Sequence, residues 1–266
     1  MKSSPADALP HALGDTDLRR RLAAQPLALF LDYDGTLTPI VARPELAVLD
    51  MGMRSALEHL AGLGVVGIIS GRDLDDVRDM VDTPGLWYAG SHGLDISGPD
   101  GTAVELDGLG QLRGVLSAAA DDLDAAVASI RGAWVERKRF ADAVHFRQVD
   151  DASIPEVEAA VDRAVASHPG VRKTGGKRVF ELRPDVAWDK GRAVWSLFDR
   201  AGLQRGTVLP VFIGDDLTDE DAFAALGEDG IAIVVADDDR ETTAHYRLRD
   251  PEEVRAFLEE LTALVR

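Results

Sequence analysis

Leu29-Phe30-Leu31-Asp32-Tyr33-Asp34-Gly35-Thr36-Leu37-Thr38 is an apolar run that breaks abruptly into two acidic residues, Gly and Thr. A short apolar run before a turn predicts a buried strand, here at 27–31. Ligands of open α/β sheets bind just beyond the carboxyl ends of the strands, so we expect Asp32 and Asp34 to line a site. The alternative is a solvated turn, because Asp and Gly are common turn residues.

The carboxylates of Asp32 and Asp34 would repel each other in a dry site unless a cation offset their charge. A hard divalent ion with oxygen ligands is the natural guest, so the pair predicts Mg²⁺ as the cofactor. An aspartate held against such an ion can attack a phosphoryl group and form an aspartyl phosphate. The motif therefore favours phosphoryl chemistry if the rest of the chain supplies the other groups.

The composition limits the class of protein. The chain has 266 residues, 45% of them hydrophobic, which is enough for a substantial core. The absence of cysteine excludes disulfides, thiolate metal sites and a cysteine nucleophile. The formal charge of -18 argues against nucleic acid or an anionic membrane as a partner. There is no apolar run of about 18 residues and no signal-peptide pattern, so we expect a cytoplasmic protein, and we expect a monomer.

Strands and helices alternate over most of the chain. Apolar strands are expected at 27–31, 65–69, 86–89, 208–213 and 231–235, and helices are expected at 55–63, 189–201, 218–226 and 251–264. Such alternation predicts a Rossmann-like, doubly wound α/β fold, with a parallel sheet between two layers of helices. We assign residues 1–106 and 184–266 to this core.

The middle of the chain follows a different pattern. A long helix at 111–130 precedes two paired strands at 134–139 and 143–149, and a helix at 154–167 precedes a second hairpin at 171–182. This order predicts an inserted α+β domain with an antiparallel sheet. We place it at 107–183.

Other polar residues also follow strands. Gly214-Asp215-Asp216 ends the strand at 208–213, and Asp215 can complete a Mg²⁺ site with Asp32. Ser70-Gly71-Arg72 ends the strand at 65–69, where a hydroxyl and free N–H groups could hold phosphate oxygens, although such a sequence is more often an ordinary turn. Lys190 opens a helix, a poor dipole position for a cation, so it is expected to have a partner.

The ordered set Asp-x-Asp-Gly-Thr, Ser-Gly-Arg, Lys and Gly-Asp-Asp-x-x-Asp resembles the motifs of the haloacid dehalogenase-like phosphohydrolases. The resemblance implies that Asp32 is the nucleophile, and that Asp34 is the general acid and base and also binds Mg²⁺ through its carbonyl. Asp215 would be the remaining metal ligand, Ser70 would bind phosphate and Lys190 would steady the aspartyl phosphate. The supporting residues of these motifs are Gly71, Gly214, Asp216 and Asp219, the last of which would orient Lys190.

The insert lies where this superfamily carries its larger, C2-type cap, and its order resembles the cap of the trehalose-6-phosphate phosphatases. The strings that carry this resemblance include Gly90-Ser91-His92-Gly93, Glu136-Arg137-Lys138, Val144-His145-Phe146-Arg147 and Gly176-Lys177-Arg178-Val179-Phe180-Glu181. The resemblance implies a phosphorylated sugar as the partner. The residues expected to bind it are Arg72, His92, Glu136, Lys138, Arg147, Lys177 and Glu181. One departure is Phe146, where the family string has Tyr.

The expected activity is Mg²⁺-dependent hydrolysis of trehalose 6-phosphate to trehalose and phosphate. A phosphatase for another phosphorylated disaccharide or glycoside stays open, such as sucrose, glucosylglycerol, mannosylglycerate or a pseudo-disaccharide. A sugar phosphomutase on the same architecture and a non-catalytic sugar-phosphate sensor are further alternatives. Carboxylates and ammonium groups in the insert suit sugar hydroxyls, although a solvated hairpin face would also carry them.

Overall fold

The structure, a computed structural model, describes residues 3–101, 103–106, 108–176 and 178–264. The chain folds into two compact units. Unit 1 comprises Met1–Val104 and Trp188–Arg266, and unit 2 comprises Glu105–Ala187. That these units act as a catalytic core and a cap stays a prediction. No helix in the described ranges has both the length and the apolar character needed to cross a membrane.

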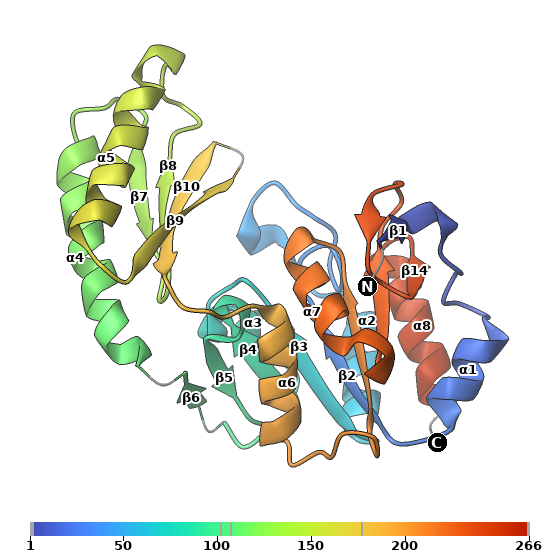
Figure 1. Cartoon of the computed structure of the whole chain (residues 1–266). Coiled ribbons are helices and arrows are strands. Elements are labelled where there is room, and N and C mark those ends of the chain that lie inside the picture. The colour runs from blue at the N-terminus through green and yellow to red at the C-terminus, as the bar shows by residue number, and fades with distance from the viewer. Residues whose placement is uncertain (1–2, 102, 107, 177, 265–266) are drawn as a thin grey trace. The chain divides into compact units, whose positions relative to one another are not determined.

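An eight-stranded sheet forms the centre of unit 1 (Figure 1). In spatial order its strands are β14 (Tyr246–Leu248), β12 (Ile231–Val235), β11 (Leu209–Gly214), β2 (Leu27–Leu31), β3 (Val65–Ile69), β4 (Trp87–Gly90), β5 (Asp95–Ser97) and β6 (Ala103–Glu105). Strands β14 through β4 are parallel, and β5 pairs with β4 in the antiparallel sense. The predicted α/β class is confirmed, and the antiparallel extension was not expected.

Helices cover both faces of this sheet (Figure 1). One layer contains α1 (Thr16–Ala23), α2 (Met51–Ala61), α3 (Leu74–Val81) and α8 (Pro251–Leu264), and the other contains α6 (Lys190–Arg200) and α7 (Glu220–Leu226). Strand β2 shows why the sheet is buried on both sides. Leu29 and Leu31 point into the first layer, and Ala28 and Phe30 point into the second. A continuous apolar run is what a parallel strand between two helix layers requires.

Short elements complete unit 1, and caps set some of the helix bounds. The two-stranded sheet pairs β1 (Ser4–Pro5) with β13 (Glu241–Thr242), and the 3₁₀ helices are η1 (Ala6–Ala8), η2 (Pro44–Leu46), η3 (Ser91–Gly93), η5 (Leu217–Asp219) and η6 (Gly227–Asp229).

Helix α2 begins at Met51 rather than at 55 as expected. The reason is that the Asp50 carboxylate accepts hydrogen bonds from the N–H groups of Gly52 and Met53, at 2.9 and 3.2 Å.

Unit 2 is an antiparallel sheet with two helices packed on one face. Its elements are α4 (Leu109–Val127), β7 (Trp134–Arg137), β8 (Asp142–His145), η4 (Asp151–Ser153), α5 (Ile154–Ser167), β9 (Val171–Gly176) and β10 (Val179–Pro184). The strand order is β7-β8-β10-β9. Residues such as Val135, Val144 and Leu182 alternate into a core with α4 and α5, so the opposite face of the sheet carries the polar residues between them.

Asp142 is a buried acid on the helix-facing side of this sheet. It is 3% exposed, and none of the described residues gives its Oδ2 a hydrogen bond. Burial raises the pKa of its carboxyl to about 6, against the opposing influence of Arg137. Ionising this carboxyl costs more in the folded state than in the unfolded chain. The resulting loss of folding stability is complete above pH 6 and disappears as the pH falls toward 4.

We predict that Asp142→Asn raises the free energy of unfolding of the protein near pH 7.5 by about 1–3 kcal/mol, since the uncharged amide avoids the cost of a buried charge. Urea unfolding of the wild type and the variant at pH 7.5 and pH 5 checks this, and the difference should shrink at the lower pH. Asp185→Asn, at an exposed position of the same unit, is the control. Equal stabilities at pH 7.5 would contradict the prediction.

Candidate active site

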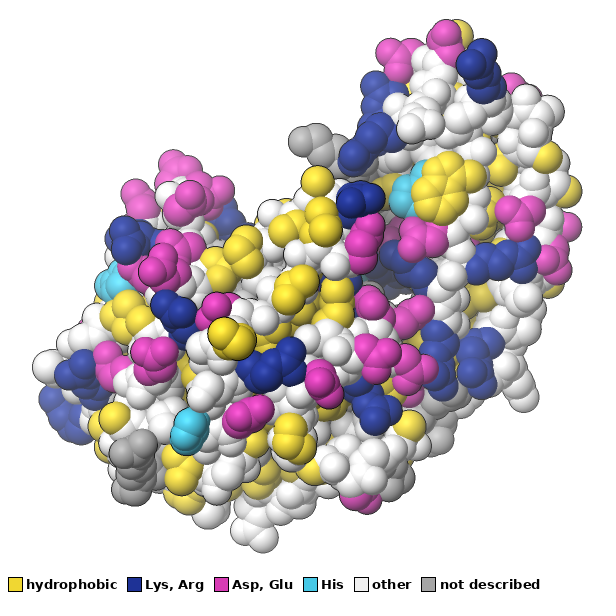
Figure 2. Space-filling view, turned by 180° about the vertical axis from the view of Figure 1, so that it is seen from behind, with side chains coloured by type: hydrophobic (Ala, Val, Ile, Leu, Met, Phe, Trp, Pro, Cys, Tyr) yellow, Lys and Arg dark blue, Asp and Glu magenta, His cyan; other side chains and the backbone are white. Residues whose placement is uncertain are grey.

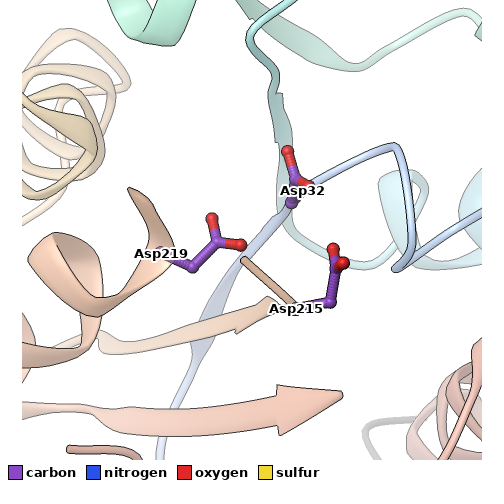
Figure 3. Close-up of side chains that lie close together, drawn as sticks. All are labelled: Asp32, Asp215 and Asp219. Carbon is purple, nitrogen blue, oxygen red and sulfur yellow. The ribbon is translucent and has the colours of Figure 1, made fainter. Parts of the chain in front are cut away.

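The carboxyl ends of two neighbouring strands bring acidic side chains together. Asp32 follows β2, Asp215 follows β11, and the Asp32 N–H donates to the carbonyl of Ile213 at 2.9 Å across the parallel pair. Carboxylate oxygens of Asp32, Asp215 and Asp219 all lie within 4.8 Å of one another (Figure 3). The sequence predicted the meeting of Asp32 with Asp215 and left Asp219 with a supporting role.

Lys190 lies buried against this cluster. Its ammonium donates to Asp32 Oδ1 at 2.8 Å and to Asp219 Oδ1 at 2.6 Å, and the residue is 3% exposed. It is the first residue of α6, which Asp189 caps by accepting from the Arg192 N–H at 2.8 Å. Burial lowers the pKa of Lys190, but the two carboxylates outweigh this effect and raise it above its usual range. The lysine is therefore charged. The sequence predicted a partner for it, and the structure shows two, Asp32 and Asp219.

The charge balance of the cluster suits a cation. Ionising all three carboxylates against one ammonium would leave an excess of two negative charges. Burial raises the pKa of Asp215 to about 6, and it also raises that of Asp32 against the attraction of Lys190. Both oxygens of Asp219 are already used, one by Lys190 and one by the N–H of Asp216 at 2.8 Å. A divalent ion with oxygen ligands therefore fits between Asp32 and Asp215.

Two glycines allow the carboxylates to approach the backbone. Gly35 has a φ of +87°, and a Cβ there would lie 2.0 Å from Asp215 Oδ2. A Cβ on Gly214 would lie 2.4 Å from the Asp219 carboxyl carbon. Neither position can carry a side chain unless an acid moves, so these glycines keep the carboxylates close to the strand ends.

Asp34 does not join the acidic cluster, because Arg72 holds its carboxylate. The Arg72 guanidinium donates to Asp34 Oδ2 and Oδ1 at 2.7 and 2.6 Å, and also to Asp76 at 3.1 Å. The guanidinium lies 5.4 Å from the centre of the Tyr33 ring, and the Tyr33 hydroxyl donates to the carbonyl of Ala47 at 2.6 Å. The sequence predicted both Asp34 and Arg72 as site residues and missed their pairing with each other.

The turn after β3 packs against the turn after β4. The N–H of His92 donates to the Ser70 carbonyl at 2.8 Å, and the N–H of Ser91 donates to the Arg72 carbonyl at 2.7 Å. Gly71 leaves room for the imidazole, since a Cβ there would lie 2.9 Å from the His92 ring. Ser70 is 1% exposed, and its hydroxyl accepts from the Arg72 N–H at 3.1 Å. The Ser-Gly-Arg and Ser-His-Gly strings therefore form one structural feature.

Three further residues shape the loop after β11. The predicted supporting residue Asp216 is exposed and caps η5, forming a capping box with Asp219. The Thr36 hydroxyl donates to Asp215 Oδ1 at 3.1 Å, and the Arg240 guanidinium donates to the backbone carbonyls of Asp215 and Asp216. The sequence predicted no role for Thr36 and did not predict Arg240. Arg240 follows three consecutive acids, and no local pattern indicates its contacts.

The polar face of the unit 2 sheet carries three of the seven predicted sugar-binding residues, namely Glu136, Lys138 and Glu181. Glu136 accepts from His145 Nε2 at 2.7 Å. Glu181 accepts two hydrogen bonds from Arg183, at 2.9 and 2.6 Å, and lies 3.8 Å from the Lys138 ammonium. Carboxylates on this face are therefore held in place by His145, Arg183 and Lys138 on the same face.

Two further residues of unit 2 were predicted to bind the sugar. Arg147 is exposed just after β8, and Lys177 lies outside the described residues. Phe146 is buried in the core of unit 2 and stacks on Phe180 with ring centres 4.6 Å apart. The change from the family's Tyr therefore falls on the core side of the sheet, away from the polar face.

Comparisons with known proteins show the family of the chain. A sequence model of the trehalose-phosphatase family matches residues 30–252. An uncharacterized glycosyl hydrolase of Mycobacterium tuberculosis is 46% identical over 92% of this chain, which spans 19% of that relative's length. A trehalose-phosphate phosphatase of the same organism is 42% identical over 97% of this chain, which spans 67% of that relative.

Solved structures share the fold. The C-terminal domain of C. albicans trehalose-6-phosphate phosphatase has a TM-score of 0.75 and 25% identity, with 96% of this chain and 98% of that one covered. A haloacid dehalogenase-like hydrolase from Bacteroides thetaiotaomicron has a TM-score of 0.62 at 15% identity, over 89% of this chain and 99% of that one. The predicted haloacid dehalogenase-like fold is confirmed. Because the family model covers most of the 266 residues, the chain belongs to the trehalose-phosphatase family.

Proposed function

We propose that the chain is a Mg²⁺-dependent phosphatase that hydrolyses trehalose 6-phosphate to trehalose and inorganic phosphate. The observation that carries the proposal is the buried Asp32 carboxylate at the end of β2, paired with Lys190 and next to Asp215. Membership of the trehalose-phosphatase family supports the substrate, and so does the 42% identity to a trehalose-phosphate phosphatase. Both oxygens of Asp219 are occupied, which leaves Asp32 and Asp215 as the acids of this cluster available to hold a cation.

The reaction has two displacement steps at phosphorus. An Asp32 oxygen attacks the phosphoryl group, the bond between phosphorus and the sugar oxygen breaks, and Asp34 gives a proton to the leaving alkoxide. Water then attacks the aspartyl phosphate, Asp34 takes a proton from that water, and inorganic phosphate leaves while Asp32 is regenerated. The two hydrogen bonds from Arg72 orient the Asp34 carboxyl, and one of them opens when that carboxyl carries the proton. Lys190 holds the Asp32 carboxylate through Oδ1.

In this proposal the side chains of Asp32 and Asp215 and the backbone carbonyl of Asp34 would hold Mg²⁺. When bound, the ion supplies positive charge that offsets the phosphoryl oxygens and the carboxylates. The excess of negative charge in the cluster supports the assignment, and so does the all-oxygen donor set. Ser70 is proposed to bind a phosphoryl oxygen through its hydroxyl, and His92 to line the same site.

Unit 2 is proposed to act as the cap that selects the sugar. Glu136 and Glu181 can accept hydrogen bonds from sugar hydroxyls, and Lys138 and Arg147 can donate them. Lys177 belongs to the same proposal on sequence grounds alone. The existing hydrogen bonds of Glu136 and Glu181 support it, because they fix the carboxylates before any ligand arrives.

A phosphate-release screen across sugar phosphates, with and without Mg²⁺, tests the function. The expected result is release from trehalose 6-phosphate that exceeds release from sucrose, glucosylglycerol and mannosylglycerate phosphates and that depends on Mg²⁺. Formation of an isomeric sugar phosphate without free phosphate would favour a phosphomutase, and binding without turnover would favour a sensor. The expected monomeric state and cytoplasmic location stay predictions, and sedimentation velocity checks the first.

Asp32→Asn should lower phosphate release by at least about 1,000-fold, since the amide is a poor nucleophile and no other group replaces it. Acid quenching during turnover with labelled substrate should leave phosphate on the wild-type protein and none on the variant. The control is Asp79→Asn, at an exposed position of α3. Wild-type turnover by Asp32→Asn would end the nucleophile assignment.

Arg240→Met should weaken Mg²⁺ binding by about tenfold, because the loop that presents Asp215 loses the hydrogen bonds to its carbonyls. Titration calorimetry with Mg²⁺ measures this directly and needs no substrate. Arg200→Met, at the exposed end of α6, controls for the loss of a cation. An unchanged Mg²⁺ affinity would show that Arg240 does not position the loop.

Glu181→Ala should raise the KM for trehalose 6-phosphate by about tenfold or more, because a hydrogen bond to a charged group contributes about 1.5–3 kcal/mol. Turnover of a generic aryl phosphate should be unaffected, since that substrate has no sugar. Glu158→Ala is the matched control. Glu158 lies on α5, at the other face of the same sheet, and binds Lys173 of β9. Equal losses on both substrates would argue against a role in sugar recognition.

A further inference from the structure

Trp134 is an exposed aromatic residue on the polar face of the unit 2 sheet. It alternates with Val135, which packs in the core, so the indole and Glu136 project from the same face. Trp134 is 53% exposed, and it is the only large hydrophobic residue in the described part of unit 2 with more than a third of its surface exposed. Leaving an indole in water forgoes a large amount of apolar burial, so this exposure suggests that a ligand covers the ring.

The indole is held rigidly from one side. Trp134 pairs with His145 across β7 and β8, and the two rings stack with centres 4.1 Å apart and planes inclined by 12°. His145 Nε2 lies 2.7 Å from a Glu136 carboxylate oxygen, so one imidazole fixes both the indole and the carboxylate. The stack covers one face of the indole, and the exposed surface of the residue leaves room for a second flat group on the other face.

The surroundings match the chemistry of a sugar ring. A pyranose has an apolar face of C–H groups and a rim of hydroxyls, and a flat aromatic ring flanked by carboxylates complements both. Glu136 is directly beside the stacked rings, and Glu181 lies on the same sheet face with Lys138 and Arg183. Figure 2 shows a histidine (cyan) against a hydrophobic side chain (yellow) on unit 2, with acidic and basic side chains around them.

We propose that Trp134 is a stacking platform for a pyranose ring of the substrate, and that His145 is a positioning residue that holds the indole and the Glu136 carboxylate together. The inference rests on the proposed function, because it assumes that unit 2 binds the sugar. It adds to that function a contact that is apolar and therefore independent of the phosphate. Sugar binding through this contact should occur even with unphosphorylated trehalose.

The first experiment follows tryptophan emission during titration with trehalose, with no phosphate present. The chain has four tryptophans, so Trp134→Phe and Trp195→Phe are compared with the wild type. The expected result is a saturable change in emission for the wild type and Trp195→Phe that is lost in Trp134→Phe. A change that persists in Trp134→Phe, or a wild type that does not respond, would overturn the platform.

The second experiment measures kinetics with trehalose 6-phosphate and with an aryl phosphate. Trp134→Leu should raise the KM for the sugar phosphate by about tenfold with little change in kcat, and Trp134→Phe should retain most of the affinity. The KM and kcat for the aryl phosphate should be the same for the wild type and both variants. An unchanged KM for Trp134→Leu would overturn the proposal, and so would a change in sedimentation coefficient on loss of the indole, which would assign the surface to self-association.

His145 is tested by a conservative replacement. His145→Gln keeps a planar amide that can donate to Glu136, whereas His145→Ala keeps neither the stack nor the donor. The KM for trehalose 6-phosphate is expected to be lowest for the wild type, higher for His145→Gln and highest for His145→Ala. The kcat should change little. Equal KM values for the two variants would overturn the positioning role.

Failure of the function and failure of the platform give different results. If the wild type releases no phosphate from any sugar phosphate but trehalose still changes Trp134 emission, the proposed reaction fails and the sugar platform stands. If the wild type hydrolyses trehalose 6-phosphate and the Trp134 variants behave like the wild type in both experiments, the function stands and the platform fails.

Discussion

The buried Lys190 ammonium, bonded to Asp32 and Asp219, is the interaction on which the site in unit 1 depends. Placing an ion in a protein interior costs several kcal/mol, and it is tolerated only when partners of opposite charge and good geometry offset it. The ammonium connects three segments that are far apart in the sequence: the end of β2, the η5 turn and the start of α6. Loss of the lysine would leave two buried carboxylates without their cation, so the arrangement is cooperative.

The local chain geometry follows from this charge cluster. A lysine at a helix start opposes the helix dipole, yet that position directs Nζ toward the strand ends, and the Asp189 cap stabilises the first turn. Gly35 and Gly214 have a complementary function, since any side chain there would occupy the space of Asp215 or Asp219. The apolar strands fix the backbone, the glycines bring the acids close, and the lysine offsets part of their charge.

The sequence predicted the elements that depend on local pattern and missed contacts that depend on tertiary structure. Apolar strands followed by abrupt acids predicted where Asp32 and Asp215 would lie, because parallel strands present their carboxyl ends at one edge. The poor dipole position of Lys190 predicted a partner, and the resemblance to known motifs supplied Asp219 as the residue that orients it. Nothing local predicted the Arg240 hydrogen bonds to the loop, because a guanidinium that reaches backbone carbonyls leaves no periodic signal. Strand register leaves Trp134 exposed, which its residue type alone does not predict.

Three cations of the candidate site are already paired with acids. In the part of unit 1 that the structure describes, Lys190 is bonded to two aspartates, Arg72 to Asp34 and Asp76, and Arg240 lies 3.5 Å from Glu220. Each of these cations is already partly neutralised, so none offers a phosphate dianion a full positive charge. Under the proposed function, a divalent cation held by the carboxylates would supply the positive charge that these paired side chains do not. On this argument the acidic cluster would not obstruct the proposed reaction, because its carboxylates would attract the cation that a phosphorylated substrate needs.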